Sequence, residues 1–438
     1  MYATLDIDMN VNDTHESDLM RCVHCGLCLN ACPTYLETGS EADSPRGRIV
    51  LMHGLHAGTL SSKDSDVVRH LDLCLGCRAC ETACPSGVPY GNLIEVARNQ
   101  INQARVRPKS TQFSRWALLE TMTRPEAMTL AMETARRVTG GIVPPLASRI
   151  ISDDTKASAQ KISLPEKISP PLPPAFTPAV GAKRFRVGVL SGCVMRVLFG
   201  ETNTDTVRVL AANGCEVLVN RKQGCCGALH LHNGQIDAGR ELARSLIDAF
   251  SPFDGLDAII VNSAGCGSTL KEYGHLFADD RKYAEKAAAF AAKVRDVSEF
   301  LSEVGWVAPL KPLREEHERV TVVVAYHDAC HLAHGQQIRE APRELLSRIP
   351  GLTLKPLTES EICCGSAGIY NLTEPEMAKR LQQRKVQHIL DTGASIVATG
   401  NPGCLAWIQS GLDGRDGDSI RVVHPVTLLA EALNLQSD

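Results

Sequence analysis

The amino-acid sequence predicts an α+β protein of several domains, in which an α-helical N-terminal domain precedes two repeated α/β domains. Eight of the 17 cysteines fall in two tight groups within the first 100 residues. The others recur in matched sets in the second half, where apolar stretches typical of buried strands alternate with helical stretches. A chain of 438 residues, 44% of them hydrophobic, can form more than one core.

The N-terminal cysteines follow one spacing twice. The two runs are Cys22-x2-Cys25-x2-Cys28-x3-Cys32-Pro33 and Cys74-x2-Cys77-x2-Cys80-x3-Cys84-Pro85. This spacing wraps a loop round an iron–sulfur cube so that three thiolates reach three irons, while the fourth points elsewhere. Structural zinc sites usually show two pairs of cysteines instead. Residues 1–100 are therefore predicted to form a ferredoxin-like domain with two [4Fe–4S] clusters.

The fourth cysteine of each run is expected to ligate the other cluster, as in two-cluster ferredoxins. The small residues Gly26, Gly76 and Ala79 leave room for the backbone to approach the cluster sulfides. Three nearby arginines, Arg46, Arg48 and Arg78, either supply positive charge to the clusters or lie solvated on the surface. The predicted metal ligands are Cys22, Cys25, Cys28 with Cys84, and Cys74, Cys77, Cys80 with Cys32.

Residues 101–163 contain no cysteine and are predicted to form a helical extension, followed by a proline-rich linker at 164–182. The extension and the residues just before it are locally basic. This pattern suits an anionic membrane surface, an ordinary solvated helix or a docking face for a partner. The basic residues are Arg98, Arg105, Arg107, Lys109 and Arg115.

After the linker the chain repeats itself, so residues 183–310 and 311–438 are predicted to be two cysteine-rich domains. Cys193, Cys225–Cys226–Gly227 and Cys266 recur as Cys330, Cys363–Cys364–Gly365 and Cys404, offset by 137 or 138 residues. Alternating strands and helices imply parallel strands, whose carboxyl ends bring the cysteines together. The expected strands are Arg186–Leu190, Glu216–Val219 and Asp257–Val261, then Val320–Ala325, Leu352–Leu357 and Ser395–Thr399.

Each repeat offers four thiols, which either hold a further iron–sulfur or metal site or belong to a scaffold without metal. Adjacent cysteines chelate one ion awkwardly but can reach neighbouring irons of a cluster. Cys215 is left over and is expected to be a small buried core residue. Five histidines near these thiols are either ligands, proton carriers or structural residues: His230, His232, His327, His331 and His334.

Bulk properties exclude several functions. The formal net charge of −4 gives no basic face for nucleic acid. No apolar run approaches the ~20 residues of a spanning helix, and the acidic N-terminus lacks the features of a signal peptide, so a cytoplasmic protein is expected. No G-x-G-x-x-G loop or flavin fingerprint is present, and no catalytic residue is predicted. Two-electron chemistry is therefore expected on another polypeptide, with this chain as a single-electron relay.

The motifs together resemble the iron–sulfur subunit of bacterial glycolate oxidase over nearly the full chain. They are less similar to the corresponding subunits of anaerobic glycerol-3-phosphate dehydrogenase and heterodisulfide reductase. In that broader family each repeat often ends in C-x-x-C, but Ser263 and Asn401 stand at the first position here, which argues against a five-thiolate cluster. The segments that carry the resemblance are CVHCGLCLNACPTY, SPRGRI, CLGCRACETACPSGVPY, GCCGALH and CCGSAG.

The resemblance implies a complex in which an FAD-binding flavoprotein subunit oxidises glycolate to glyoxylate and this chain passes electrons to a membrane quinone. The complex is then expected at the inner face of the cytoplasmic membrane. The repeats are expected to serve electron exit. Alternatives are the equivalent relay for lactate or glycerol-3-phosphate dehydrogenase, or a non-catalytic iron–sulfur redox sensor.

Overall fold

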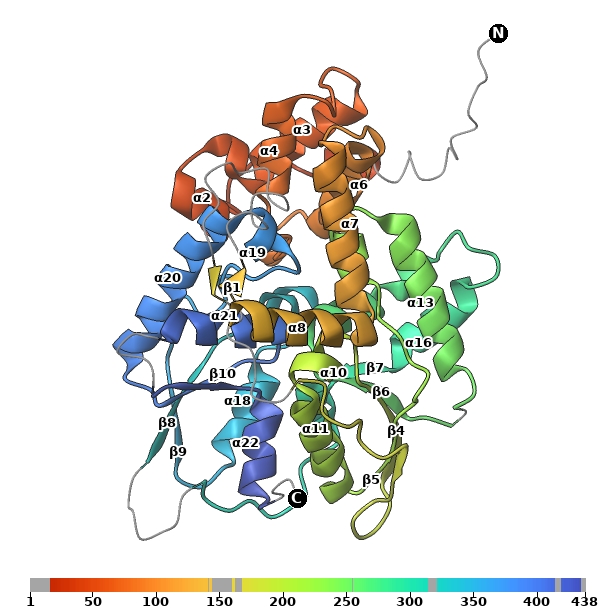
Figure 1. Cartoon of the computed structure of the whole chain (residues 1–438), viewed down its shortest axis with the longest axis vertical. Helices are drawn as coiled ribbons and strands as arrows, with labels where there is room; N and C mark the ends of the chain where they lie inside the picture. Colours follow the sequence, from red (N-terminus) through yellow and green to blue (C-terminus); the bar gives the residue numbers. More distant parts are fainter. Residues whose placement is uncertain are drawn as a thin grey trace.

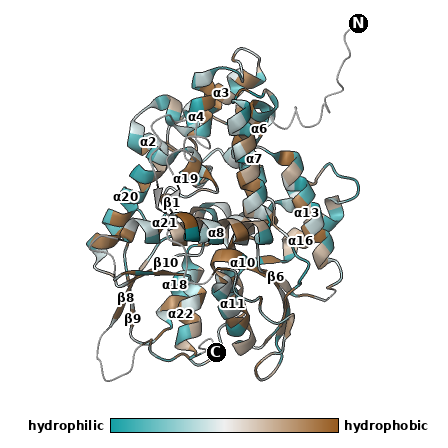
Figure 2. Cartoon of the chain, in the orientation of Figure 1, coloured by the Kyte–Doolittle hydropathy of each residue, from teal (hydrophilic) through white to brown (hydrophobic). Residues whose placement is uncertain are grey.

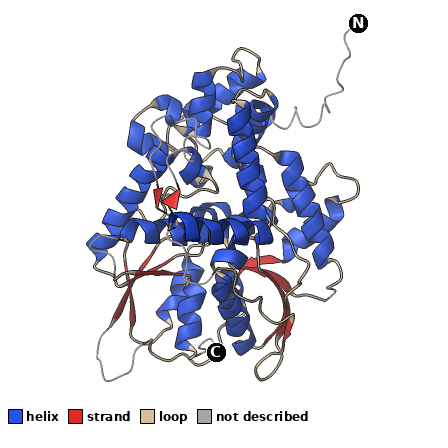
Figure 3. Ribbon diagram, in the orientation of Figure 1, coloured by secondary structure: helices blue, strands red, loops and turns tan. Residues whose placement is uncertain are grey.

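The computed structural model describes residues 16–140, 142–143, 160–161, 168–253, 255–313, 321–413 and 419–434. Parts of the predicted extension and linker, and the expected strand start at Val320, lie outside these residues. Helices form the upper part of the molecule in Figure 1, and two sheets lie side by side below them (Figures 1 and 3). This arrangement confirms the predicted multidomain α+β layout.

The N-terminal module, residues 16–103, is built from short helices whose starts the sequence specifies. Pro33 and Pro45 occupy the first turns of their helices, where a missing N–H costs nothing. Asp64 caps another helix by accepting hydrogen bonds from two backbone N–H groups. Leu71, Leu93 and other apolar side chains form the core. The elements are α2 (Pro33–Thr38), η1 (Glu41–Asp43), α3 (Pro45–His56), α4 (Ser65–Asp72), α5 (Ala79–Thr82) and α6 (Tyr90–Gln103).

Two helices, α7 (Lys109–Thr123) and α8 (Pro125–Thr139), follow the module and lie between it and the sheets (Figure 1). Pro125 starts α8 directly after α7 ends, and Gly140 ends α8 in the left-handed conformation. The described residues beyond α8 include a short antiparallel pair, β1 (Ile142–Val143) and β2 (Gln160–Lys161). The helical character predicted for this region is therefore confirmed up to Thr139.

The first repeat contains a five-stranded sheet in the order β3-β5-β4-β6-β7. All its neighbouring strands pair in parallel except β3 and β5, which are antiparallel. The prediction of a uniformly parallel sheet is thus wrong at this edge, because Phe176–Thr177 of the proline-rich linker adds a strand there. The strands are β3 (Phe176–Thr177), β4 (Phe185–Leu190), β5 (Cys215–Leu218), β6 (Ala258–Val261) and β7 (Val294–Asp296).

Helices connect these strands. Gly214, between α11 and β5, has a φ of +83°, which glycine adopts without strain. The helices are α10 (Val194–Leu198), α11 (Gly200–Ala212), α12 (Ala228–His232), α13 (Ile236–Phe250), α14 (Ala264–Lys271), α15 (Tyr273–Leu276), α16 (Ala284–Lys293) and α17 (Val297–Glu303).

The second repeat contains a fully parallel sheet in the order β11-β10-β8-β9. The three strands expected here are present: β9 and β10 are shorter than predicted, and β8 ends one residue later, at Tyr326. Strand β11 was not predicted. The strands are β8 (Val322–Tyr326), β9 (Leu352–Lys355), β10 (Ile396–Ala398) and β11 (Arg421–Val423). The helices are η3 (His331–Gly335), α18 (Glu340–Ser347), α19 (Tyr370–Thr373), α20 (Pro375–Thr392), α21 (Pro402–Leu412) and α22 (Pro425–Ala432).

The two repeats share one apolar core. Helix α11 packs against α22, and α17 packs against α18, so two helices from each repeat lie between the sheets. Buried side chains of both sheets, such as Val189 and Val324, belong to this core. Figure 2 shows apolar and polar residues mixed along the outer helices α13 and α20. The carboxyl ends of both sheets face the N-terminal module, which positions the site.

Candidate functional site

The first set of N-terminal thiols lies at the surface. Cys22, Cys25, Cys28 and Cys84 line one hollow, and Cys25 is exposed. Gly26 has a φ of +83°, and a Cβ there would lie 2.7 Å from the guanidinium of Arg46. A glycine is therefore needed where the loop turns between the thiols.

The second set is buried. A neighbouring hollow is lined by Cys32, Cys74, Cys77 and Cys80, all of them buried. The backbone of this loop also turns through left-handed residues, Gly76 and Arg78. The fold thus gathers the two crossed sets that the sequence suggests, although Cys80 borders both hollows. The assignment of each cysteine to one cluster stays a prediction.

Arg48 is a buried cation beside the second set. Its side chain is 1% exposed and donates hydrogen bonds to the Thr34 hydroxyl (3.0 Å) and the Cys32 sulfur (3.9 Å). Burial disfavours its charge, yet Cys74 and other acidic neighbours raise the pKa of Arg48 above its usual value. Of the two roles considered for this arginine, the surface role is wrong. Arg46 and Arg78 instead form ion pairs with Glu41 and with Glu81 and Glu272.

The chemistry of both sets fits iron–sulfur clusters. All 17 cysteines are free, so none is consumed in a disulfide. Burial raises the pKa of the Cys77 and Cys80 thiols, and neighbouring thiols add to this effect. Thiols with a pKa raised in this way lose their protons readily only when they bind a metal ion. The N–H of Gly76, 3.3 Å from the Cys74 sulfur, shows that backbone donors reach the ligand atoms.

The cysteines of each repeat gather at the carboxyl ends of its strands, as predicted. In the first repeat the Cys193 and Cys225 sulfurs are 3.5 Å apart. In the second, Cys330, Cys363, Cys364 and Cys404 are neighbours in this order, and neighbouring thiols together with burial raise the pKa of the first three thiols. Most of these thiols are buried.

The glycine after each cysteine pair has a packing reason. Gly227 and Gly365 both have positive φ, and a Cβ at either position would lie 2.5 Å from a backbone carbonyl, of Gly239 in α13 or Ala378 in α20. Only glycine lets the loop turn this close to the helix. The leftover Cys215 is fully buried in β5, which confirms its predicted core position.

Several histidines join the repeats to the N-terminal module. His331 Nε2 donates to the carbonyl of Gly76 (3.0 Å), and His334 Nδ1 lies 3.0 Å from the Thr82 hydroxyl. In the first repeat, His232 Nδ1 lies 2.6 Å from a carboxylate oxygen of Glu95. These contacts support the structural role among the three that were considered.

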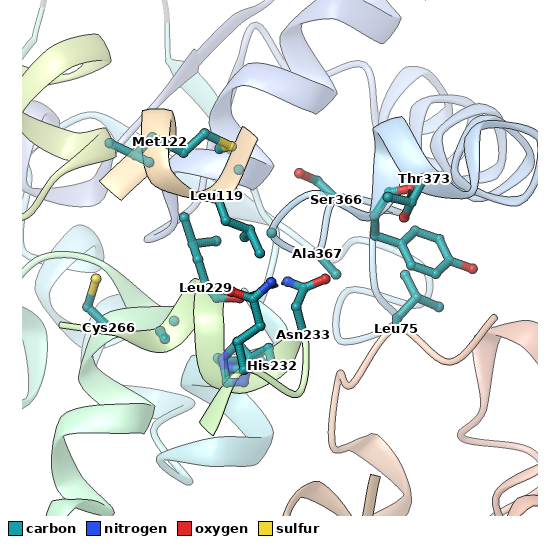
Figure 4. Close-up of a pocket in the computed structure, with 18 of the residues that line it drawn as sticks. Leu75, Leu119, Met122, Leu229, His232, Asn233, Cys266, Ser366, Ala367 and Thr373 are labelled. Atoms are coloured by element: carbon teal, nitrogen blue, oxygen red, sulfur yellow. Dashed lines mark hydrogen bonds between the residues drawn. The ribbon is translucent and has the colours of Figure 1, made fainter. Parts of the chain in front are cut away.

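A cavity of about 350 Å³ lies where the module, α7 and both repeats meet. Figure 4 shows Leu119 and Met122 of α7 facing Leu229 and His232 of the first repeat. Cysteines from the N-terminal module and from both repeats border this cavity, so it lies between the second N-terminal set and the thiols of the first repeat. They are Cys74, Cys193, Cys225, Cys226, Cys266 and Cys330.

The basic residues of the extension do not form a free surface. Arg107 and Arg115 form ion pairs with Asp72, and all three line the cavity together with Arg98. Burial alone would raise the pKa of Asp72, but these arginines hold it below its ordinary value. The suggestion that they contact an anionic membrane is therefore wrong for three of the five, because a buried carboxylate turns them inward.

Sequence reasoning also missed Lys385, a 2% exposed lysine of α20 whose charge acts on Cys363 and Cys364. The sequence did contain a signal that Lys385 is buried. Lys385 lies four residues after Leu381 and four before Ile389, which places it on the apolar face of an otherwise ordinary amphipathic helix.

Comparison with known proteins supports the two kinds of site. A 4Fe-4S dicluster domain model matches residues 18–88, and a cysteine-rich domain model matches residues 187–271 and 324–409. The chain is 38% identical to a probable glycolate oxidase iron-sulfur subunit of Bacillus subtilis, over 95% of this chain and 94% of the relative. It is 34% identical to the glycolate oxidase iron-sulfur subunit of Escherichia coli, over 95% of both. Lactate utilization protein A of Shouchella clausii is 31% identical over 57% of this chain and 98% of the relative.

Proposed function

Because this chain belongs to the family of glycolate oxidase iron–sulfur subunits, we propose that it carries electrons from a flavoprotein subunit, which oxidises glycolate to glyoxylate, to a membrane quinone. An electron-transfer role in an oxidoreductase complex follows from the family itself. The flavoprotein, the substrate and the acceptor are the proposed part.

The observation that carries the proposal is the unequal exposure of the two N-terminal thiol sets. Cys25 is exposed, and Met20, Val23 and Leu27 around it are each more than 60% exposed. These apolar side chains offer a contact face for a flavoprotein next to the first set. The second set lies inside, bordered by the repeats and the cavity. Electrons therefore enter through the exposed first thiol set and leave from the buried second set, next to the cavity.

Bound at these cysteines, [4Fe–4S] clusters would accept and release one electron at a time. This suits a donor flavin, which releases two electrons in single steps. The residues of this chain set the conditions. Arg48 places positive charge beside the inner set, and burial excludes water there. The contacts of His331 and His334 hold the second repeat against the segment that carries Cys77 and Cys80.

The central cavity suits a quinone headgroup. A quinone presents a flat apolar ring with two carbonyl acceptors, so it needs an apolar slot with a few donors. Leu119, Met122 and Leu229 supply apolar walls, and Asn233 and His232 supply polar groups (Figure 4). Cys74 borders the same space, which keeps the acceptor next to the inner thiol set.

Membrane contact is proposed through α7 and α8. Among the described residues no helix has the length and apolar character that crossing a bilayer requires. Phe113 and Trp116 on α7 and Leu130 and Val138 on α8 are large apolar residues that are about half or more exposed. Such residues insert into the boundary between headgroups and acyl chains. We place this face on the inner side of the cytoplasmic membrane.

The cavity can be tested by filling it. In the assembled complex, Leu229→Trp should leave flavin reduction by glycolate unchanged and slow reoxidation by quinone, as stopped-flow traces of the two half-reactions will show. Val180→Trp, at an exposed position between β3 and β4, is the matched control for added bulk. Equal reoxidation rates in both variants, with iron content intact, would mean that electrons pass to quinone at another site.

A lactate relay is the second candidate, because the lactate utilization relative covers 57% of this chain. The full-length likeness favours glycolate. Purification from the native host distinguishes the candidates. A co-purifying flavoprotein reduced by glycolate supports the proposal, reduction by lactate or glycerol-3-phosphate alone supports another relay, and a solitary chain supports a redox sensor.

A further inference from the structure

The two repeats differ chemically at matching positions. β4 ends at Leu190, whereas the residue 137 positions later, directly after β8, is His327. In α13 the position 138 residues before Lys385 of α20 holds Ile247. All four side chains are at most 3% exposed. The second repeat therefore adds an imidazole and an ammonium group to its four thiols, and the first repeat adds neither.

His327 is oriented as a ligand. Its Nδ1 lies 2.8 Å from the carbonyl oxygen of Ser360, and because a carbonyl only accepts, Nδ1 carries the proton. Its Nε2 then presents a lone pair, and this atom is buried without a hydrogen-bond partner. Histidines that bind metals typically donate their other ring N–H to such a carbonyl.

The unpartnered imidazole faces two thiols. One ring nitrogen of His327 and the sulfurs of Cys364 and Cys404 all lie within 4.8 Å of one another, and all three residues are buried. Two ligands about 2.3 Å from one tetrahedral ion are roughly 3.8 Å apart, so this spacing suits a single metal ion. A [4Fe–4S] cluster held by the four thiols of the repeat would leave this imidazole unused.

The surrounding charge suits thiolates at this site. Lys385 Nζ donates to the carbonyl oxygen of Glu359 and lies 3.5 Å from that of Ser360, the group that also accepts from His327. A buried ammonium offsets the negative charge that thiolates bring to a divalent ion. Asn401 Nδ2 lies 3.7 Å from the Cys404 sulfur and steadies it.

We propose that the second repeat binds one divalent ion of the zinc class through His327 Nε2 and the sulfurs of Cys364 and Cys404. The thiol of Cys363, next to that of Cys364, is available for a fourth position. The ion ties together the carboxyl ends of β8, β9 and β10, because one ligand follows each of these strands. The ion has a structural role and no redox chemistry. The thiols of the first repeat, in contrast, border the cavity.

The test is metal analysis of the anaerobically purified full chain. The wild type should hold about one zinc ion beside about eight irons. His327→Leu, which installs the residue of the first repeat, should lose the zinc and keep the iron. Cys266→Ser in the first repeat is the matched control and should keep both. X-ray absorption at zinc should show sulfur at about 2.3 Å and nitrogen at about 2.0 Å, in a ratio near two to one.

Three outcomes would overturn the site: a wild type without zinc, zinc that survives His327→Leu, or about four additional irons that survive it. If His327→Leu does not fold, His327→Cys should retain zinc while its nitrogen shell disappears. These readouts do not depend on glycolate, flavin or quinone, so the site and the proposed function can fail separately.

Discussion

The guanidinium of Arg98 donates a 2.7 Å hydrogen bond to the carbonyl oxygen of His232, 134 residues further along the chain. The same group also donates to the carbonyl oxygens of Leu71, Asp72 and Cys74. One side chain therefore joins the first repeat to the loop that carries the inner thiol set. This contact holds one wall of the central cavity in place.

Replacing Arg98 with alanine should loosen this junction. The carbonyl groups would lose a charged donor in a partly buried place, which is expected to cost about 2 kcal/mol or more in the free energy of unfolding. Hydrogen exchange should rise at residues 71–76 and 230–235, and the thermal midpoint should fall. Arg105→Ala removes an exposed arginine nearby and should change neither. Unaltered exchange in both segments would show that other contacts hold the modules together.

The crossed ligand sets can be tested through their unequal exposure. Wild-type chain should bind about eight irons. Cys84→Ser should damage the exposed cluster and leave iron that a bulky chelator removes slowly. Cys32→Ser should damage the buried cluster and leave iron that the chelator removes quickly. The reverse pattern of chelation rates would mean that each run of cysteines ligates its own cluster, and zinc in place of iron would contradict the cofactor itself.

Arg48 should raise the reduction potential of the inner cluster. A buried positive charge next to Cys32 favours the added electron, so Arg48→Met should lower one potential by on the order of 50 to 100 mV. Redox titration followed by electron paramagnetic resonance measures this. Arg48→Lys keeps the charge and should shift the potential less. Arg46→Met, at a more exposed arginine paired with Glu41, should also have a smaller effect. Equal shifts in all three variants would contradict the assignment.

Asp205 makes the contact between the repeats sensitive to pH. Burial raises the pKa of this carboxyl to about 6, with smaller effects of its neighbours, and the hydroxyl of Thr427 in α22 donates to it over 2.9 Å. Because the folded pKa is raised, the stability that the neutral acid contributes is present below about pH 4 and is lost as pH rises through about 6. The loss at pH 8 is on the order of 1–2 kcal/mol after allowance for partial exposure.

Asp205→Asn keeps a hydrogen-bond acceptor and removes this loss. The variant should therefore unfold at a higher temperature than the wild type at pH 8 and at a similar temperature at pH 4. Glu241→Gln, at an exposed position of α13, is the control and should unfold at the wild-type temperature at both pH values. A gain for Asp205→Asn that is equal at both pH values would rule out titration of this carboxyl as its cause.

Local chemistry along the chain was enough to predict the elements and the thiol loops. The spacing of Cys22, Cys25 and Cys28, and the proline after Cys32, depend on backbone geometry over a few residues. The constant offset between the repeats predicted two similar units. Their strands could be placed because runs such as Val322–Tyr326 are apolar on both faces, as in a buried parallel strand.

Residue types alone did not predict which way long side chains turn. Arg107 and Arg115 look like surface residues in sequence, but Asp72 turns them into the cavity. In the same way, the sequence left three roles open for His327, and only the fold shows that it lies close to Cys364 and Cys404. Such partners are 35 to 77 residues apart, and no local rule connects them.

The sequence by itself therefore determined the two kinds of cysteine-rich unit, their order and their repetition, because loop spacing and strand patterning are local properties of the chain. The tertiary structure alone decided that one N-terminal thiol set is exposed and the other buried, that a cavity separates the inner set from the first repeat, and that the repeats differ in the groups around their thiols. These properties depend on packing between segments that lie tens to hundreds of residues apart. There, burial and hydrogen bonding select among arrangements that the local pattern permits equally.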